Sequence, residues 1–187
     1  MTQERGRCLT RVVWINGAFG VGKTTAARVL AQSVPSAVVI DPEHVGMMLR
    51  ASLQPVAPVR DFQDWRAWRT LVPATINAII AELDGKNNLV IVPQTITNEL
   101  YGSEIVAGLQ PTITLATVAL RVDKHMHRQR VLADTDDPGA AQWRIDKFAE
   151  FEAAAWVHSA FAGIDTTKMD PDEVVSHVER IIRETPL

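Results

Sequence analysis

NGAFGVGKTT, residues 16–25, is the stretch that decides the fold of this chain. From Gly17 to Thr24 it matches the pattern G-x-x-x-x-G-K-[ST], whose glycines let successive backbone N–H groups turn inward around a phosphate at a helix start. Lys23 would add charge beside the β- and γ-phosphates, and the Thr24 hydroxyl would ligate Mg²⁺. The pattern predicts a nucleotide-binding loop made of Gly17, Ala18, Phe19, Gly20, Val21, Gly22, Lys23, Thr24 and Thr25.

Around this loop the sequence alternates between short β-branched runs and helical stretches. Five runs are expected to be strands, over residues 11–16, 37–40, 89–92, 112–122 and 161–165. Helices are expected over 23–33, 42–53, 61–83, 98–109 and 140–158 and from 123 and 171 onward, with a turn at 84–87 and a polar break at 134–139. This alternation is typical of a parallel sheet covered on both faces. We predict a three-layer α/β/α P-loop NTPase fold, with a five-stranded, mainly parallel sheet in a single domain over residues 1–187.

The composition is that of a globular protein and disfavours several classes of function. The chain has 187 residues, of which 47% are hydrophobic and 22% charged, and its net charge of −3 argues against a general nucleic-acid binder. The single cysteine, Cys8, forms no internal disulfide, and the first ten residues lack the apolar core of a signal peptide. The most apolar stretch, residues 113–120, is too short to span a bilayer. We therefore expect a cytoplasmic protein without stable membrane association, and the oligomeric state is left open.

One sequence pattern is typical of a GTPase, but two other features of the sequence argue against that function. Residues 167–170 (TKMD) match the guanine-reading pattern [NT]-K-x-D in about the right place. However, Asp170 already has a sufficient role as the N-cap of the last helix, ahead of Pro171. The third strand ends in Pro93-Gln94-Thr95, without the D-x-x-G that a switch GTPase requires. The sequence therefore favours a kinase.

A carboxylate follows the second predicted strand. Asp41-Pro42 indicates a helix start, with Asp41 as N-cap and Pro42 at the first helical position. We expect this strand to lie beside the strand that precedes the loop, so that Asp41 faces the γ-phosphate and orients or deprotonates an acceptor hydroxyl. Capping alone would explain the residue equally well, and the two roles are compatible.

A basic run, KHMHRQR over residues 124–130, follows the fourth predicted strand. Arg128 and Arg130 would close over the nucleotide, one against the base and one towards the phosphates, so Arg130 joins Lys23 and Asp41 as a candidate catalytic residue. Arg144, beyond the polar break, would close from the other side. The predicted lid covers about residues 128–144, and the alternative is an ordinary solvated helix face.

Several stretches carry a family resemblance: VVWINGAFGVGKTT (12–25), IDPEHVGMMLR (40–50), DFQDWRAW (61–68), LVIVPQTIT (89–97), the Arg128/Arg130 run and QWRIDK (142–147). Together they resemble the tunicamycin-resistance protein family of P-loop ATP-binding proteins. The resemblance implies a nucleoside-kinase-like fold that binds ATP with Mg²⁺ and phosphorylates the nucleoside antibiotic tunicamycin or a similar compound, which would confer resistance. The ending FAGIDTTKMDPDEVV (161–175) also resembles shikimate- and gluconate-type kinases, which implies that residues 165–167, including Thr167, lie near the base.

The acceptor pocket should be walled by residues after the second and third strands and on the helix between them. This position nominates Arg50, Asp61, Trp65, Trp68, Arg69 and Gln94. Trp65 and Trp68 are three residues apart on one helical face, a spacing typical of core packing, although an aromatic wall would suit a uracil or sugar ring. Two other functions stay open: a protein that sequesters tunicamycin with ATP only ordering the pocket, and a GTPase-like switch.

Overall fold

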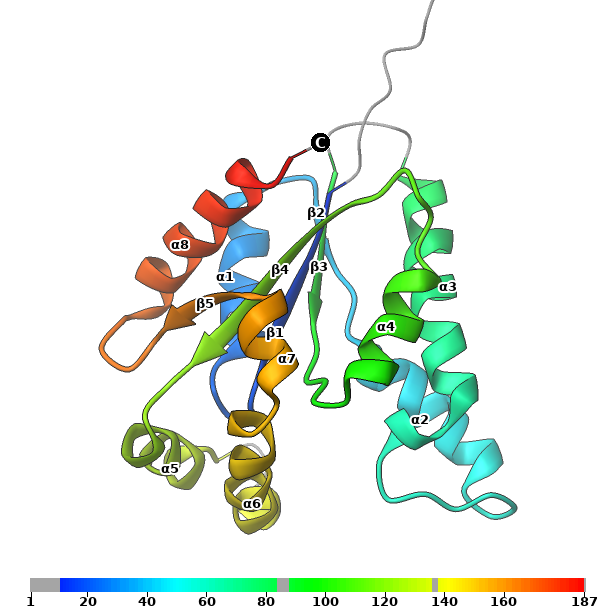
Figure 1. Cartoon of the computed structure of the whole chain (residues 1–187), viewed down its shortest axis with the longest axis horizontal. Coiled ribbons are helices and arrows are strands. Elements are labelled where there is room, and N and C mark those ends of the chain that lie inside the picture. The colour runs from blue at the N-terminus through cyan, green and yellow to red at the C-terminus, as the bar shows by residue number, and fades with distance from the viewer. Residues whose placement is uncertain (1–10, 84–87, 136–137, 187) are drawn as a thin grey trace, which may run out of the picture.

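The computed structural model describes residues 11–83, 88–135 and 138–186, and its centre is a five-stranded sheet. The strands are β1 (Arg11–Gly17), β2 (Ala37–Val39), β3 (Leu89–Pro93), β4 (Thr114–Arg121) and β5 (Ala162–Asp165). They are all parallel and lie in the order β2-β3-β1-β4-β5 (Figure 1), which confirms the predicted fold class. The expectation that the second strand lies beside the first was wrong, because β3 pairs with both β1 and β2 and separates them.

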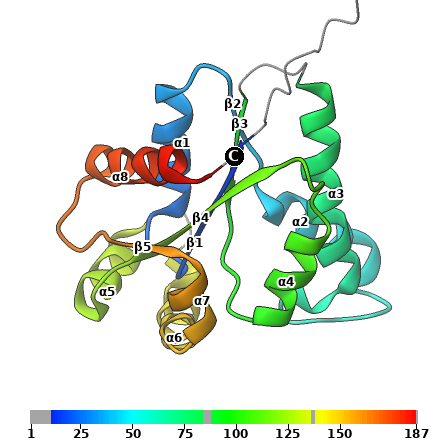
Figure 2. The same ribbon diagram turned by 45° about the horizontal axis from the view of Figure 1, so that its top comes forward.

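Helices cover both faces of the sheet, as Figures 1 and 2 show. One face carries α1 (Lys23–Ser33) and α8 (Pro171–Glu184), and the other carries α3 (Arg66–Glu82), α4 (Glu99–Ala107) and α7 (Ala155–Ala160). The remaining elements lie towards the carboxyl edge of the sheet: α2 (Pro42–Leu53), η1 (Phe62–Asp64), α5 (Lys124–Ala133), η2 (Pro138–Ala140) and α6 (Ala141–Glu152). Among the described residues, no helix combines the length and the apolar character needed to cross a membrane.

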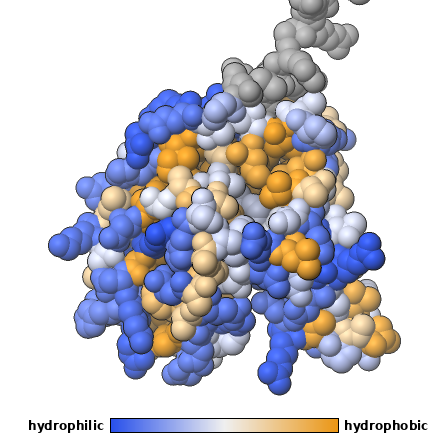
Figure 3. Space-filling view, viewed as in Figure 1, coloured by the Kyte–Doolittle hydropathy of each residue, from blue (hydrophilic) through white to orange (hydrophobic). Residues whose placement is uncertain are grey.

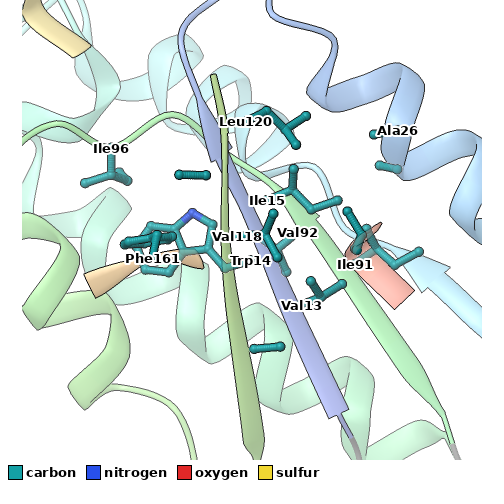
Figure 4. Close-up of a cluster of buried hydrophobic side chains, with 14 of the residues drawn as sticks. Val13, Trp14, Ile15, Ala26, Ile91, Val92, Ile96, Val118, Leu120 and Phe161 are labelled. Atoms are coloured by element: carbon teal, nitrogen blue, oxygen red, sulfur yellow. The ribbon is translucent and has the colours of Figure 1, made fainter. Parts of the chain in front are cut away.

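Side chains alternate across β1 and so fill the core on both sides of the sheet. Val13 and Ile15 lie on the side of α1, near Ala26, whereas Trp14 lies on the opposite side (Figure 4). There the Trp14 ring packs edge-on against Phe161, with ring centroids 5.3 Å apart. All five side chains are buried, which holds β1, and the loop that follows it, in one position.

The helix expected over residues 140–158 is divided in the structure. It consists of α6 and α7, which are separated at residues 153–154. Phe151 and Val157 are both fully buried. Six residues correspond to about 600° of helix rotation, so one continuous helix would point these two side chains in different directions. The interruption lets both reach the core. The helix expected over residues 61–83 is divided as well, into η1 and α3, which are separated at the extended residue Trp65. The remaining predicted elements are confirmed within a few residues at their ends, and the turn expected at 84–87 and residues 136–137 of the polar break lie outside the described residues.

Candidate functional site

The carboxyl edge of the sheet holds a cleft of about 620 Å³. Parallel sheets commonly bind ligands at this edge, because the loops that leave the strands meet there. The walls come from the loop after β1, the start of α2, the η1 segment, the end of β3 and the start of α6. The notch at the lower edge of the surface in Figure 3 lies between two of these walls, α6 on one side and α2 on the other.

The glycine-rich loop has the backbone shape expected for a phosphate-binding loop. Gly20 and Gly22 have φ values of 82° and 108°, a left-handed conformation that side chains with a Cβ rarely adopt. A Cβ on Gly20 would also lie 2.7 Å from a methyl carbon of Val131. The first N–H groups of α1 have no side-chain cap, and Lys23, Thr24 and Thr25 line the cleft. An uncapped helix start of this kind attracts phosphate.

The base of the loop is tied to the segment after β3. The buried Asn16 accepts hydrogen bonds from the backbone N–H groups of Gly17 (2.8 Å) and Ile96 (3.1 Å). Thr95 donates its hydroxyl proton to the Gly17 carbonyl at 2.8 Å. These contacts hold the loop in place before any ligand arrives.

Lys23 is held inside the loop. Its Nζ donates to the carbonyls of Gly17 (3.0 Å) and Ala18 (2.9 Å) and lies 5.3 Å from the centre of the Phe19 ring. Burial lowers the pKa of Lys23 from its usual 10.5 to about 8, while the charges of Glu43 and Asp41 act in the opposite direction. The negative charge of a phosphate bound in the loop would stabilise the ammonium form of Lys23 and so raise its pKa again.

Two carboxylates at the start of α2 line the same cleft. Asp41 caps the helix as predicted, since its Oδ1 accepts the Glu43 backbone N–H at 2.9 Å. Glu43, which the sequence analysis did not select, also lines the cleft. Burial raises the pKa of the Glu43 carboxyl, the Asp41 charge adds to this, and Lys23 and Arg144 oppose it. The signal for Glu43 was present in the DPE triplet, two residues after Asp41.

Neither of the two lid arginines predicted on α5 lines the cleft. Arg128 is exposed and is not among the residues that line the cleft. Arg130 also lies outside the lining, because its guanidinium donates to the Thr166 hydroxyl (3.0 Å) and carbonyl (2.7 Å) and to the Val21 carbonyl (3.3 Å). Arg144 does line the cleft and forms an ion pair with Asp134 at 2.5 Å.

An aromatic residue of α6 reaches the phosphate-binding loop. Trp143, which the sequence analysis did not select, lines the cleft, and its ring centre lies 4.5 Å from that of Phe19. The side chain remains 45% exposed, so part of its ring faces the solvent or a ligand. The stretch QWRIDK, which carries the family resemblance, contains both Trp143 and Arg144.

Thr167 lies in a tight turn after β5 rather than in the cleft lining. Its hydroxyl donates to Asp165 Oδ1 at 2.6 Å and accepts the Asp123 backbone N–H at 3.0 Å. The Thr167 hydroxyl and the Thr167 backbone N–H, which both donate to this carboxylate, lower the pKa of Asp165. The carboxylate of Asp170 accepts the Glu173 N–H at 2.9 Å in a capping box on α8. The TKMD stretch therefore has a structural explanation in helix capping.

The acceptor-side candidates separate into two groups. Arg50, Asp61, Trp68 and Gln94 line the cleft. The Arg50 guanidinium stacks 4.5 Å above the ring of Phe62, and Phe62 also lines the cleft. Burial raises the pKa of the Asp61 carboxyl. The cleft also includes three polar residues that the sequence analysis did not select: Arg28, Arg60 and Gln63.

Trp65 and Arg69 do not reach the cleft lining. Trp65 is 6% exposed and donates its indole N–H to the Ala57 carbonyl at 2.8 Å, which fastens the loop before η1. Arg69 forms an ion pair with Glu104 of α4 at 2.7 Å and stacks on Tyr101. Trp65 is thus a core residue, the alternative that the sequence left open, whereas Trp68 is 2% exposed and also lines the cleft.

The sheet order, the glycine-rich loop after β1 and the cleft at the carboxyl edge define a P-loop NTPase fold of the kinase-like type. The sequence matches no protein-family model and no curated protein. Among solved structures, the tunicamycin resistance protein of Deinococcus radiodurans matches with a TM-score of 0.67 and 22% identity, over 93% of this chain and 96% of its own.

Two further solved structures share the architecture. A sugar kinase from Janibacter sp. HTCC2649 matches with a TM-score of 0.67 and 18% identity, over 95% of this chain and 96% of its own. The shikimate kinase of Acinetobacter baumannii matches with a TM-score of 0.62 and 15% identity, over 97% of each chain. At these identities the likeness shows the fold. The structural neighbours include a tunicamycin resistance protein, in agreement with the family resemblance noted in the sequence.

Proposed function

We propose that this protein is an ATP- and Mg²⁺-dependent phosphotransferase that phosphorylates a hydroxyl group of a small molecule. The observation that carries the proposal is that a phosphate-binding loop and a pair of carboxylates, Asp41 and Glu43, line one cleft. The same cleft continues past Arg50 and Asp61, which leaves room for a second, polar substrate beside the nucleotide.

Each group near the loop has a role in this reaction. Bound Mg²⁺·ATP supplies the γ-phosphoryl group, and the Thr24 hydroxyl would hold the metal. Lys23 and the N–H groups at the start of α1 stabilise the negative charge of the transferring phosphoryl. Asp41 orients the acceptor and takes its hydroxyl proton as the acceptor oxygen bonds to phosphorus and ADP departs. Arg144 and Trp143 close the cleft from the α6 side and limit the access of water.

For the acceptor, we propose a nucleoside antibiotic, with tunicamycin as the first compound to test. Support comes from the sequence stretches that resemble the tunicamycin-resistance family and from the structural likeness to the Deinococcus radiodurans protein. The exposed part of Trp143 and the Phe62 ring offer aromatic surfaces for a flat ring, and Gln94 and Gln63 offer amide groups for its polar edge.

The test is to incubate the protein with ATP, Mg²⁺ and each acceptor and to search for a product heavier by one phosphoryl group by mass spectrometry. The panel contains tunicamycin, uridine, a neutral sugar and shikimate. Tight ATP-dependent binding of tunicamycin without any product would instead support sequestration, and better binding of GTP than of ATP would support a switch.

The Asp41→Asn variant tests the carboxylate. Asn retains a side-chain oxygen that can cap α2, so the fold should persist, whereas loss of the proton acceptor should lower kcat by about 100-fold or more. Asp170→Asn is the matched control, because Asp170 also caps a helix ahead of a proline but does not line the cleft. Full activity in Asp41→Asn, or equal losses in both variants, would refute the catalytic role of Asp41.

A further inference from the structure

Two side chains of α5 hold the phosphate-binding loop from behind. His127 is 1% exposed, and its Nε2 lies 2.7 Å from the carbonyl oxygen of Phe19. One turn further along α5, Arg130 reaches the carbonyl of Val21 at 3.3 Å. Both contacts join residues more than 100 positions apart, and both end on backbone carbonyls of the loop.

The direction of these carbonyls determines the direction of the N–H groups that would meet a phosphate. In a planar trans peptide, the C=O of one residue and the N–H of the next point in opposite directions. A side chain that holds the Phe19 carbonyl therefore also aims the Gly20 N–H the opposite way. By the same geometry, the contact on Val21 fixes the Gly22 N–H. Gly20 and Gly22 are the two residues of the loop with left-handed backbone, and both line the cleft.

We propose that His127 is a positioning residue of the phosphate-binding loop, whose Nε2–H donates to the Phe19 carbonyl and thereby aims the Gly20 N–H at a bound phosphate. This inference rests on the nucleotide binding of the proposed function. A carbonyl oxygen can only accept a hydrogen bond, so the proton must be on Nε2. Burial lowers the pKa of His127, as do the charges of Lys23 and Arg130, whereas the hydrogen bond to Phe19 and the charge of Glu152 act in the opposite direction. The net lowering favours the neutral ring with a single N–H.

His127 also connects the loop with the wall formed by α6. Its ring stacks on Phe148 of α6, with ring centres 4.3 Å apart and an angle of 28° between the planes. Its Nε2 lies 3.9 Å from the position that a Cβ on Gly20 would occupy. Packing alone would be preserved by another aromatic ring, whereas positioning requires the N–H. The two roles can therefore be separated by substitution.

The test compares four proteins: the wild type, His127→Phe, His127→Gln and His127→Asn. Phe preserves the stack but has no donor. The amide nitrogen of Gln can reach the position of Nε2, whereas that of the shorter Asn cannot. We expect His127→Phe and His127→Asn to bind ATP about tenfold more weakly than the wild type, because the Phe19 carbonyl would lose its donor and would no longer be held in one orientation. His127→Gln restores a donor and should recover most of the affinity.

Calorimetry with ATP and with inorganic tripolyphosphate gives the main readout, and binding of adenosine, followed by ligand-observed NMR, gives the control. Tripolyphosphate should lose affinity in parallel with ATP, and adenosine, which has no phosphate, should not. Equal ATP affinity in the wild type and His127→Phe would overturn the inference. If the Phe variant does not fold, equal affinity in the Gln and Asn variants would overturn it. Absence of ATP binding by the wild type would instead overturn the proposed function, and this inference with it.

Discussion

Lys23 makes nucleotide binding depend on pH in a direction that the structure fixes. In the free protein, burial lowers the pKa of its ammonium group from 10.5 to about 8. Phosphate oxygens in the loop would stabilise the charged form and raise this pKa well above its free value. Binding is therefore strongest below pH 8, where the lysine already carries its proton, and weakens as the pH rises through 8.

The size of the effect follows from the charged fraction of Lys23. With a free-state pKa of about 8, about three quarters of the molecules carry the charge at pH 7.5 and about one tenth at pH 9. If only the charged form binds, the ATP affinity falls about eightfold over this interval, which corresponds to about 1.2 kcal/mol. The terminal phosphate of ATP is ionised throughout this range, so the ligand itself adds little change.

Isothermal titration calorimetry in two buffers of different ionisation enthalpy measures this coupling directly. At pH 9 the wild type should take up nearly one proton for each ATP bound, and close to none at pH 7. Lys23→Arg is the control, because an arginine remains charged at pH 9 and should bind without proton uptake. An ATP affinity that stays constant between pH 7.5 and 9, with no proton uptake, would refute the inferred environment of Lys23.

Whereas the ATP affinity should fall as the pH rises, the contribution of Lys23 to the stability of the free protein should increase. Because the folded-state pKa of Lys23 lies below its unfolded value of 10.5, the unfolded chain binds more protons between about pH 8 and 10.5. The contribution of Lys23 to the free energy of unfolding therefore rises as the pH increases through this window. Urea unfolding of the wild type and Lys23→Met would separate this contribution from those of other groups.

Two substitutions test the walls of the cleft. Trp65→Phe should lower the free energy of unfolding by about 1–2 kcal/mol, because the hydrogen bond to the Ala57 carbonyl is lost. The ATP affinity of this variant should not change. If a stably folded Trp65→Phe variant bound the acceptor more weakly, Trp65 would belong to the substrate site after all. Gly46→Ala should cost about 1–3 kcal/mol in urea unfolding, because its Cβ would overlap the Phe62 ring. Since that ring supports Arg50, the KM of the acceptor should rise while that of ATP stays constant, and wild-type stability would contradict the packing.

The glycine-rich loop and the start of α2 could be predicted from the sequence because their information is local. The loop is a contiguous motif with glycines where φ is positive, and the Asp41-Pro42 pair encodes a helix start. The alternation of strands and helices gave the parallel sheet. The order of the strands was not encoded in the same way, since the position of β3 between β1 and β2 depends on how the crossover helices pack.

The roles of the basic helix could not be predicted, because they depend on its rotation about its own axis. His127, Arg130 and Val131 are three and four residues apart and face the loop, whereas Arg128 faces outward. The sequence shows that residues 124–130 are rich in basic side chains, but it does not show which of these side chains point towards the loop. Trp143 was missed for a related reason, since it reaches the cleft only through the placement of α6, whereas Glu43 was missed although it follows Asp41 by two residues.

The two ends of the cleft are held in place by different contacts. The loop is held by buried or partly buried groups from the segment after β3 and from α5, namely Thr95, His127 and Arg130. The opposite wall, around Arg50 and Phe62, is formed by α2 and η1, and Gln63 of η1 joins it to the Thr95 carbonyl by a hydrogen bond of 3.0 Å. Arg50 and Phe62 stack on each other rather than on the loop, so we expect substitutions of these two side chains to leave the loop in place. Substitutions at Arg50 should therefore alter the choice of acceptor, and substitutions at His127 should alter the affinity for phosphate.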